Sequence, residues 1–196
     1  MTTYSRTRLH RASAALLGSL PVMLLIVGGL GVRASAAIRP VSLDQLVQHS
    51  TAAVVATVRE QRSRPGTWPG VGSLPFTDFT LTVESVWFGP TERKEWIVSV
   101  PGGTDAFGRQ VEVSDMARLR VGDRVLLFLH ERTIGAGEEK RTETWVTGSV
   151  QGCYPMRKQR VVGRKQFPIP QDVLAYYLRP QVLSLVKRNP TCTPQR

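Results

Sequence analysis

Alternating apolar and polar side chains along the middle of the chain predict a domain built from β-strands. Apolar residues fall at every second position over residues 76–88, and the same period returns over residues 95–100. Such alternation is typical of a strand with one buried face. Residues 53–59 are small and β-branched, and residues 125–129 are apolar without a break, so we expect two buried strands there.

Shorter segments complete the predicted sheet. We expect an edge strand at 109–113, a returning strand at 144–150 and a final strand at 160–162. Several glycines and prolines predict a break between strands over residues 61–72, and residues 135–141 have the polarity of a hairpin loop. Because no long helix separates these strands, the pattern predicts a mainly β domain, either an antiparallel sandwich or a small barrel.

Helical periodicity occurs before the first predicted strand and after the last one. Over residues 40–49, Ser42 and Gln45 have the spacing of a capping box, and an apolar face follows at i, i+3 and i+4. Over residues 173–186 apolar side chains again recur at helical spacing, but Pro180 interrupts them. Because proline is costly inside a helix, we expect two short helices or one kinked helix.

The first 36 residues have the composition of an export signal. A basic start over residues 6–11 precedes 19 uncharged residues, 14–32, and a small-residue A-x-A motif at 34–36. Cleavage after Ala36 would release residues 37–196 as a single domain, either periplasmic or secreted. The uncharged segment is also long enough to cross a bilayer. An uncleaved anchor, with that segment in the membrane, is therefore the alternative.

The charge of the chain predicts an anionic neighbour. The formal net charge is +11, and +7 remains after residue 36 because the signal holds four of the 26 basic residues and no acidic one. Outside the cytoplasm this excess favours lipid headgroups, acidic glycans or an acidic protein by long-range attraction. Nucleic acid is not an expected partner in that compartment.

One basic run is the main candidate binding site. Its cations flank a short apolar segment, residues 161–163, and Tyr154 lies just before them. They are Arg157, Lys158, Arg160, Arg164 and Lys165. Basic and aromatic residues together serve polymer-binding barrels of the OB type, so the run predicts an anion-binding groove. The alternative is a solvated hairpin face that holds no ligand.

Cys153 and Cys192 are the two cysteines of the chain. In an oxidising compartment two cysteines in one chain most often pair. A bridge between them would hold the C-terminal tail, which has few apolar residues of its own. Two free thiols are the alternative. Because no histidines cluster beside them, the pair does not indicate a zinc site.

No residue pattern in the sequence indicates catalysis, a metal site or a cofactor. His49 and His130 stand alone, which favours structural roles, with His49 at the end of the first predicted helix. The Pro-Gly-Gly-Thr segment at 101–104 fits either a backbone nest for anions or a glycine turn that ends a strand. We expect the turn.

The motifs of the predicted strands resemble those of a group of uncharacterised exported bacterial proteins. The shared features are an AVVATV strand after a capped helix, a V-x-x-V-x-x-G strand end at 83–89, a V-x-V-P-G-G segment at 98–103 and a VGDRVLLFL strand at 121–129. Their order also resembles the OB-type barrel of netrin-like and TIMP-like domains. The resemblance covers residues 42–165. It implies a small antiparallel OB-like barrel with a short N-terminal helix and a C-terminal helical segment.

The resemblance does not extend to the inhibitory mechanism of TIMP-type proteins. In that family an N-terminal cysteine chelates the zinc of a protease, whereas here no cysteine precedes Cys153. We therefore expect an exported, non-enzymatic binding or interaction module with an unknown protein partner. The alternatives are a basic surface adaptor for an anionic envelope polymer or membrane, and a hydrolase with a dispersed site.

Overall fold

A computed structural model describes residues 39–68, 70–134, 141–165 and 167–189. The predicted export signal, its cleavage site and the candidate anchor at 14–32 lie outside the described residues, as does most of the predicted hairpin loop at 135–141. These expectations stay predictions. No helix in the described part of the chain is both long and apolar enough to cross a membrane.

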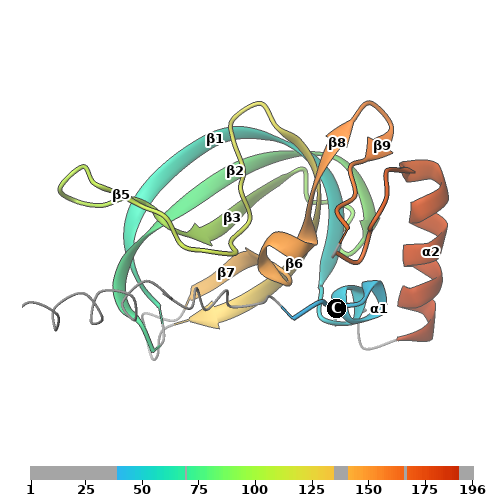
Figure 1. The fold of residues 1–196 in the computed structure, drawn as a ribbon, viewed down its shortest axis with the longest axis horizontal. Helices are drawn as coiled ribbons and strands as arrows, with labels where there is room; N and C mark the ends of the chain where they lie inside the picture. The colour runs from blue at the N-terminus through green and yellow to red at the C-terminus, as the bar shows by residue number, and fades with distance from the viewer. Residues whose placement is uncertain (1–38, 69, 135–140, 166, 190–196) are drawn as a thin grey trace, which may run out of the picture. The chain divides into compact units, whose positions relative to one another are not determined.

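The fold is mainly β, as predicted, with a short helix at its start and a longer helix at its end (Figure 1). The elements are α1 (Leu43–Gln48), β1 (Ala52–Trp68), β2 (Gly72–Phe88), β3 (Glu95–Pro101), β4 (Gly103–Thr104), β5 (Gln110–Val111), β6 (Arg124–Ile134), β7 (Arg141–Val146), the 3-10 helix η3 (Ser149–Gly152), β8 (Cys153–Arg157), β9 (Arg160–Val161), β10 (Val173–Leu174) and α2 (Ala175–Arg188).

Eight of the strands form one sheet in the order β1-β2-β3-β7-β6-β8-β9-β10. The first six residues of β1 also pair with β6, so β1, β2, β3, β7 and β6 make a partial ring of five strands. Most pairings are antiparallel, as expected, but β3 and β7 pair in parallel, so the sheet is mixed. The long connection through β4, β5 and β6 brings β7 back in the direction of β3, as a parallel pair requires.

The predicted break over residues 61–72 is wrong, because β1 and β2 continue as a hairpin of two 17-residue strands. Pro65 lies opposite Pro75 in this ladder. Proline has no N–H group and cannot donate a hydrogen bond to the neighbouring strand. Because the two prolines face each other, they share a cross-strand pair that needs no hydrogen bond. Gly66 is covered by the ring of Phe76, which fills the space that its missing side chain leaves. Cross-strand packing therefore overrides the local turn signals.

The two faces of the sheet carry two separate apolar clusters. The inner cluster receives side chains from every strand of the ring, among them Phe79, Leu81 and Val98, as the alternating pattern predicts. The outer cluster lies between the sheet, α1, α2 and the β8–β9 hairpin. Residues 125–129 of β6 are all buried because they contribute to both clusters, which confirms the prediction from their unbroken apolar run.

Helix α1 confirms the predicted capping box. The Ser42 hydroxyl accepts a hydrogen bond from the Gln45 N–H at 3.1 Å, and the Gln45 side chain accepts one from the Ser42 N–H at 3.0 Å. Of the two forms predicted for the C-terminal segment, the structure has one helix, α2, with Pro180 inside it. The segment begins later than predicted, because Val173 and Leu174 pair with β9 as the short strand β10.

The remaining short elements differ from the predictions at their ends. The edge strand expected at 109–113 shrinks to β5, and the strand expected at 144–150 is β7, which ends at Val146 before η3. The strand expected at 160–162 is present as β9, but it is not the final one, because β10 follows it. Sequence reasoning missed β8, in which Pro155 pairs with Val125 of β6.

We expect Gly66→Ala to destabilise the β1–β2 hairpin. An added Cβ would lie 2.3 Å from Cδ2 of Phe76, a ring that is itself buried, so the ring or the strand must move. Overpacking of this kind costs about 1–3 kcal/mol of unfolding free energy, measurable by urea denaturation. Thr67→Ala, at the next and exposed position, is the matched control and should change stability by less than about 0.5 kcal/mol.

Candidate functional site

The β8–β9 hairpin gathers three of the five predicted basic residues. Met156 pairs with Val161 and Arg157 pairs with Arg160, so the two arginines lie on the same face of the ladder. Lys158 is in the turn between them with a φ of 55°. All three cations are exposed. The three cations therefore surround the turn of the hairpin, which lies before residues 161–163 rather than at them.

The other two predicted cations follow β9 in a loop. The Arg164 guanidinium lies 5.3 Å from the centre of the Phe167 ring, which leaves it half-buried, whereas Lys165 is exposed. Within the described part of the chain, none of the five predicted cations takes part in an ion pair. Their charges are therefore not neutralised by described neighbours.

A groove of about 480 Å³ lies beside the hairpin, between the ends of β1 and β2 and the first turns of α2. Figure 1 shows the β8–β9 hairpin next to the start of α2. Met156 and Gln159 of the hairpin line the groove, but none of the five predicted cations does. Its positive charges come instead from Arg124 of β6 and Arg179 of α2. Sequence reasoning missed both, because no spacing in the chain links a strand residue to a distant helix residue.

Arg124 is held at the base of the hairpin. Its Nε donates to Oε2 of Glu84 at 2.7 Å, and its Nη1 donates to the carbonyl oxygen of Lys158. Glu84 also accepts a hydrogen bond from the Thr57 hydroxyl at 2.7 Å. Partial burial works to raise the pKa of Glu84, but the bonds from Thr57 and Arg124 outweigh it and lower that pKa. Glu84 is thus an ionised partner that fixes the Arg124 side chain.

Arg179 is bound more loosely than Arg124. Its Nη2 donates to the carbonyl oxygen of Val86 at 3.2 Å, and no carboxylate in the described part of the chain pairs with it. Most of its guanidinium donors are therefore available to a ligand.

Tyrosine side chains lie at the mouth of the groove. Tyr176 lines it and is 80% exposed, and its ring stands edge-on to that of Tyr177, 5.4 Å away. Tyr154, the aromatic residue that the sequence suggested for this site, is fully buried against Phe128 instead. Burial raises the pKa of Tyr154, and the side chain cannot reach a ligand. The suggestion of Tyr154 is wrong, because β8 turns it into the outer cluster.

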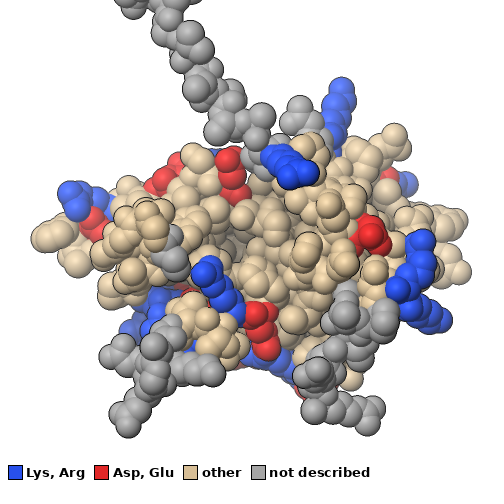
Figure 2. Space-filling model, turned by 90° about the horizontal axis from the view of Figure 1, so that it is seen from below, with Lys and Arg blue, Asp and Glu red and all other residues tan. Residues whose placement is uncertain are grey.

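One face of the molecule has few charged side chains at its centre. Figure 2 shows a face whose centre is formed by uncharged residues, with basic and acidic side chains interspersed around its edge. A mixed edge of this kind produces little net field at a distance.

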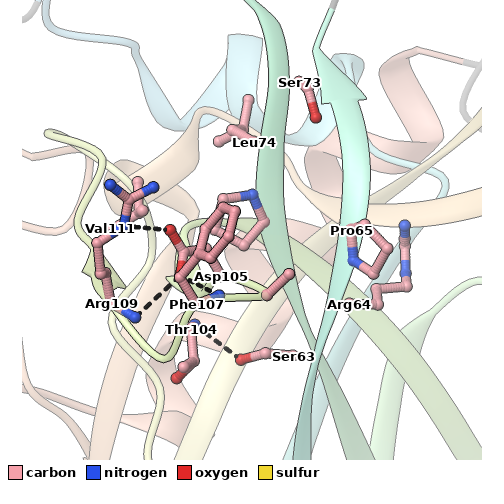
Figure 3. Close-up of a pocket in the computed structure, with 12 residues that line it drawn as sticks. Ser63, Arg64, Pro65, Ser73, Leu74, Thr104, Asp105, Phe107, Arg109 and Val111 are labelled. Atoms are coloured by element: carbon pink, nitrogen blue, oxygen red, sulfur yellow. Dashed lines mark hydrogen bonds and ion pairs between the residues drawn. The ribbon is translucent and has the colours of Figure 1, made fainter.

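A second pocket, of about 460 Å³, lies between the β1–β2 hairpin and the β4–β5 hairpin (Figure 3). Asp105 accepts hydrogen bonds from the N–H groups of Phe107 and Arg109 and from Nε of Arg109. The bond from the Arg109 N–H, with those from the Arg109 side chain and Phe107, lowers the pKa of Asp105. These contacts fix the tip of the β4–β5 hairpin, and the Ser63 hydroxyl ties its base to β1 at 3.0 Å.

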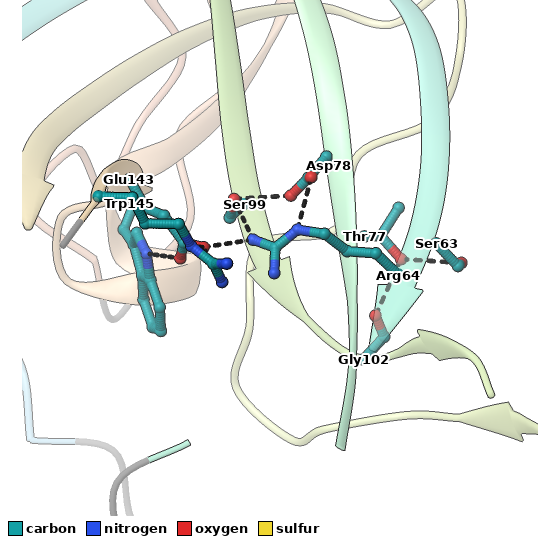
Figure 4. A network of polar contacts seen from close by, with 9 residues as sticks. Ser63, Arg64, Thr77, Asp78, Ser99, Gly102, Glu143 and Trp145 are labelled. Carbon is teal, nitrogen blue, oxygen red and sulfur yellow. Dashed lines mark hydrogen bonds and ion pairs between the residues drawn. The ribbon is translucent and has the colours of Figure 1, made fainter. Parts of the chain in front are cut away.

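The third polar cluster joins four strands of the ring through Arg64 (Figure 4). From β1, the Arg64 side chain reaches Asp78 of β2 at 2.7 Å, Ser99 of β3 at 3.2 Å and Glu143 of β7 at 2.5 Å. Burial works against the charged guanidinium, but the two carboxylates outweigh it and raise the pKa of Arg64. Glu143 also accepts hydrogen bonds from Arg141 and from Trp145 Nε1. Every charge in this cluster has a partner, so its role is to hold the strands together.

The isolated histidines have structural positions. His49 is the C-cap of α1, as expected, and donates its N–H to carbonyl groups of that helix. His130 is half-buried, and this burial, with the nearby charge of Arg132, lowers its pKa. Residues 39–68, 70–134, 141–165 and 167–189 contain no group of histidine, cysteine and carboxylate side chains with the geometry of a metal site.

The Pro-Gly-Gly-Thr segment ends a strand, as expected. Strand β3 stops at Pro101, and Gly102 and Gly103 follow with φ values of 109° and 131°, which strongly favour glycine. The Gly102 N–H donates to the carbonyl oxygen of Pro75 at 2.8 Å. Because this N–H group already makes a hydrogen bond within the fold, it is not available to bind an anion.

Cys153 is 2% exposed and lies inside the ring. Cys192 lies outside the described residues, so the predicted bridge stays a prediction. Burial raises the pKa of Cys153 to about 12, with a smaller contribution from Asp123 and an opposing one from Arg164. Because a thiolate is the reactive form, this thiol is protected both sterically and electrostatically.

No protein-family model matches this chain, and a search of curated proteins gives no match either.

We expect Arg64→Met to lower the free energy of unfolding by about 2–3 kcal/mol, because a carboxylate that is 7% exposed loses its closest cation. Denaturation by urea, followed by tryptophan fluorescence, measures the change. Arg62→Met is the matched control, since Arg62 is exposed on the same face of β1 and makes no ion pair with a described residue. Equal losses in the two variants would contradict a special role for the Arg64 cluster.

We expect Cys153 to resist alkylation until the protein unfolds. In the variant Cys192→Ser, Cys153 is the remaining thiol, and iodoacetamide at mildly alkaline pH should leave it unmodified in the native protein and modify it in denaturant. Mass spectrometry counts the adducts. Fast labelling of the native variant would show that the thiol is accessible. The same count on unreduced wild-type protein tests the predicted bridge.

Proposed function

We propose that the chain is an exported, non-enzymatic binding module that holds an anionic ligand at the β8–β9 hairpin and the adjoining groove. One observation carries the proposal: three exposed cations of the hairpin have no described counter-ion and lie beside a groove that contains two further arginines. Unpaired surface cations cost the fold little because water solvates them, and they remain free to meet an anion.

The arrangement of the ring supports a scaffold of the OB type. We propose that β1, β2, β3, β7 and β6 are a divergent OB-like barrel, because five strands close through a pairing of the first with a later one and leave the ring partly open. Barrels of this type hold polymers and oligomers without acting on them in many settings. The fold alone does not choose the ligand, so the choice rests on the charges of the hairpin and groove.

We expect charge reversal of the hairpin to abolish binding to a polyanion. The triple variant Arg157→Glu, Lys158→Glu, Arg160→Glu should bind heparin at least about tenfold more weakly than wild type at low salt, since three exposed charge contacts become repulsive. Wild-type binding should itself weaken steeply as salt is added. Titration calorimetry at several salt concentrations measures both effects.

The control is a triple variant with the same change of net charge elsewhere: Arg62→Glu, Lys94→Glu, Arg118→Glu. These residues are exposed and lie outside the β8–β9 hairpin and the groove. If both triple variants lose binding equally, attraction follows net charge and the hairpin is not a site. Salt-independent binding to an uncharged protein partner would instead favour the interaction module without an anionic ligand.

A further inference from the structure

The groove beside the β8–β9 hairpin has an apolar floor, which a purely polar ligand would not use. Val55, Trp87 and Met156 form part of this floor and are 3%, 5% and 8% exposed. Leu183 of α2 also lines the groove, and no acidic residue does. Ligand pockets of several hundred Å³ with apolar walls and few polar groups bind molecules that are largely apolar themselves.

The mouth of the same groove is cationic and aromatic. Arg124, which pairs with Glu84, and Arg179 line the groove, and the exposed cations Arg157 and Lys158 belong to the hairpin that forms one of its walls. Tyr176 of α2 also lines the groove and is 80% exposed, so its ring can meet a ligand there. Tyrosine and cationic side chains together are typical of surfaces that meet lipid headgroups.

We propose that the ligand of this groove is an anionic phospholipid. Its phosphate lies between Arg124 and Arg179, and an acyl chain covers the apolar floor next to Leu183. The basic hairpin adds long-range attraction for a negatively charged lipid surface. This inference rests on the proposed function, since it names the class of anion that the same site holds.

Four soluble probes separate the lipid from other anions. Dihexanoylphosphatidylglycerol, used below its micelle concentration, carries both the anionic group and the chains. Dihexanoylphosphatidylcholine keeps the chains without net charge, glycerol 3-phosphate keeps the anion without chains, and heparin is a polymeric anion. We expect the first probe to bind the full chain at least about tenfold more tightly than the second or the third, as measured by calorimetry.

Matched variants locate the binding. Tyr176→Ser and Arg179→Gln should each weaken binding of the anionic lipid about fivefold or more, because both residues line the groove. Phe107→Ser and Arg188→Gln are the controls, since they remove an exposed aromatic ring and an exposed arginine outside the groove. Tyr176→Ser should leave heparin binding unchanged, since heparin depends on the hairpin cations.

Each outcome decides between the two proposals. If glycerol 3-phosphate or heparin binds but the lipid gains nothing from its chains, the lipid inference fails and the proposed function stands. Equal binding of the two lipids also overturns the inference, because charge would then play no part. If Tyr176→Ser weakens binding no more than Phe107→Ser does, the lipid is bound outside the groove. If no anionic probe binds at all, both proposals fail.

Discussion

The double pairing of β1 is the interaction on which the rest of the structure depends. Its whole length pairs with β2, and its first six residues also pair with β6, which joins the two ends of the ring. This closure gives the sheet an inner and an outer face, each with its own apolar cluster. Strand β1 supplies both clusters, because Val54 faces inward and Val55 outward. Loss of the β1–β6 ladder would therefore expose the inner and the outer apolar cluster at the same time.

The candidate groove is a consequence of how the outer cluster is covered. Helix α2 and the β8–β9 hairpin lie on the outer face, and β10 links them by pairing with β9 just before the helix starts. The groove lies between α2 and the β8–β9 hairpin, and Val55 and Trp87 of the sheet line it. Arg124 also lines the groove, and its hydrogen bond to Glu84 holds it in place. The cover thus provides an apolar floor and a fixed cation in one place. The same packing that stabilises the outer face therefore shapes the proposed site.

The sequence predicts those features that follow from local periodicity or local hydrogen bonds. The alternation at Phe79 and Leu81 and the capping box at Ser42 are of this kind. The features that the sequence does not predict depend on contacts between strands that are far apart along the chain. Pro65 stays in a strand because it faces Pro75, and Tyr154 is buried because β8 pairs with β6. The cations of the groove belong to the same class, since only the tertiary fold brings two separated arginines together.

Arginine has opposite roles at the Arg64 cluster and at the β8–β9 hairpin. The charge of Arg64 is shared among Asp78 and Glu143, so removing it leaves a buried carboxylate poorly compensated. Arg157 and Arg160 form no ion pair with a carboxylate among the described residues, so they contribute little to the stability of the fold. Residues that the fold does not need for stability are free to bind a ligand. This contrast, rather than the net charge of the chain, is the reason to place the anion at the hairpin.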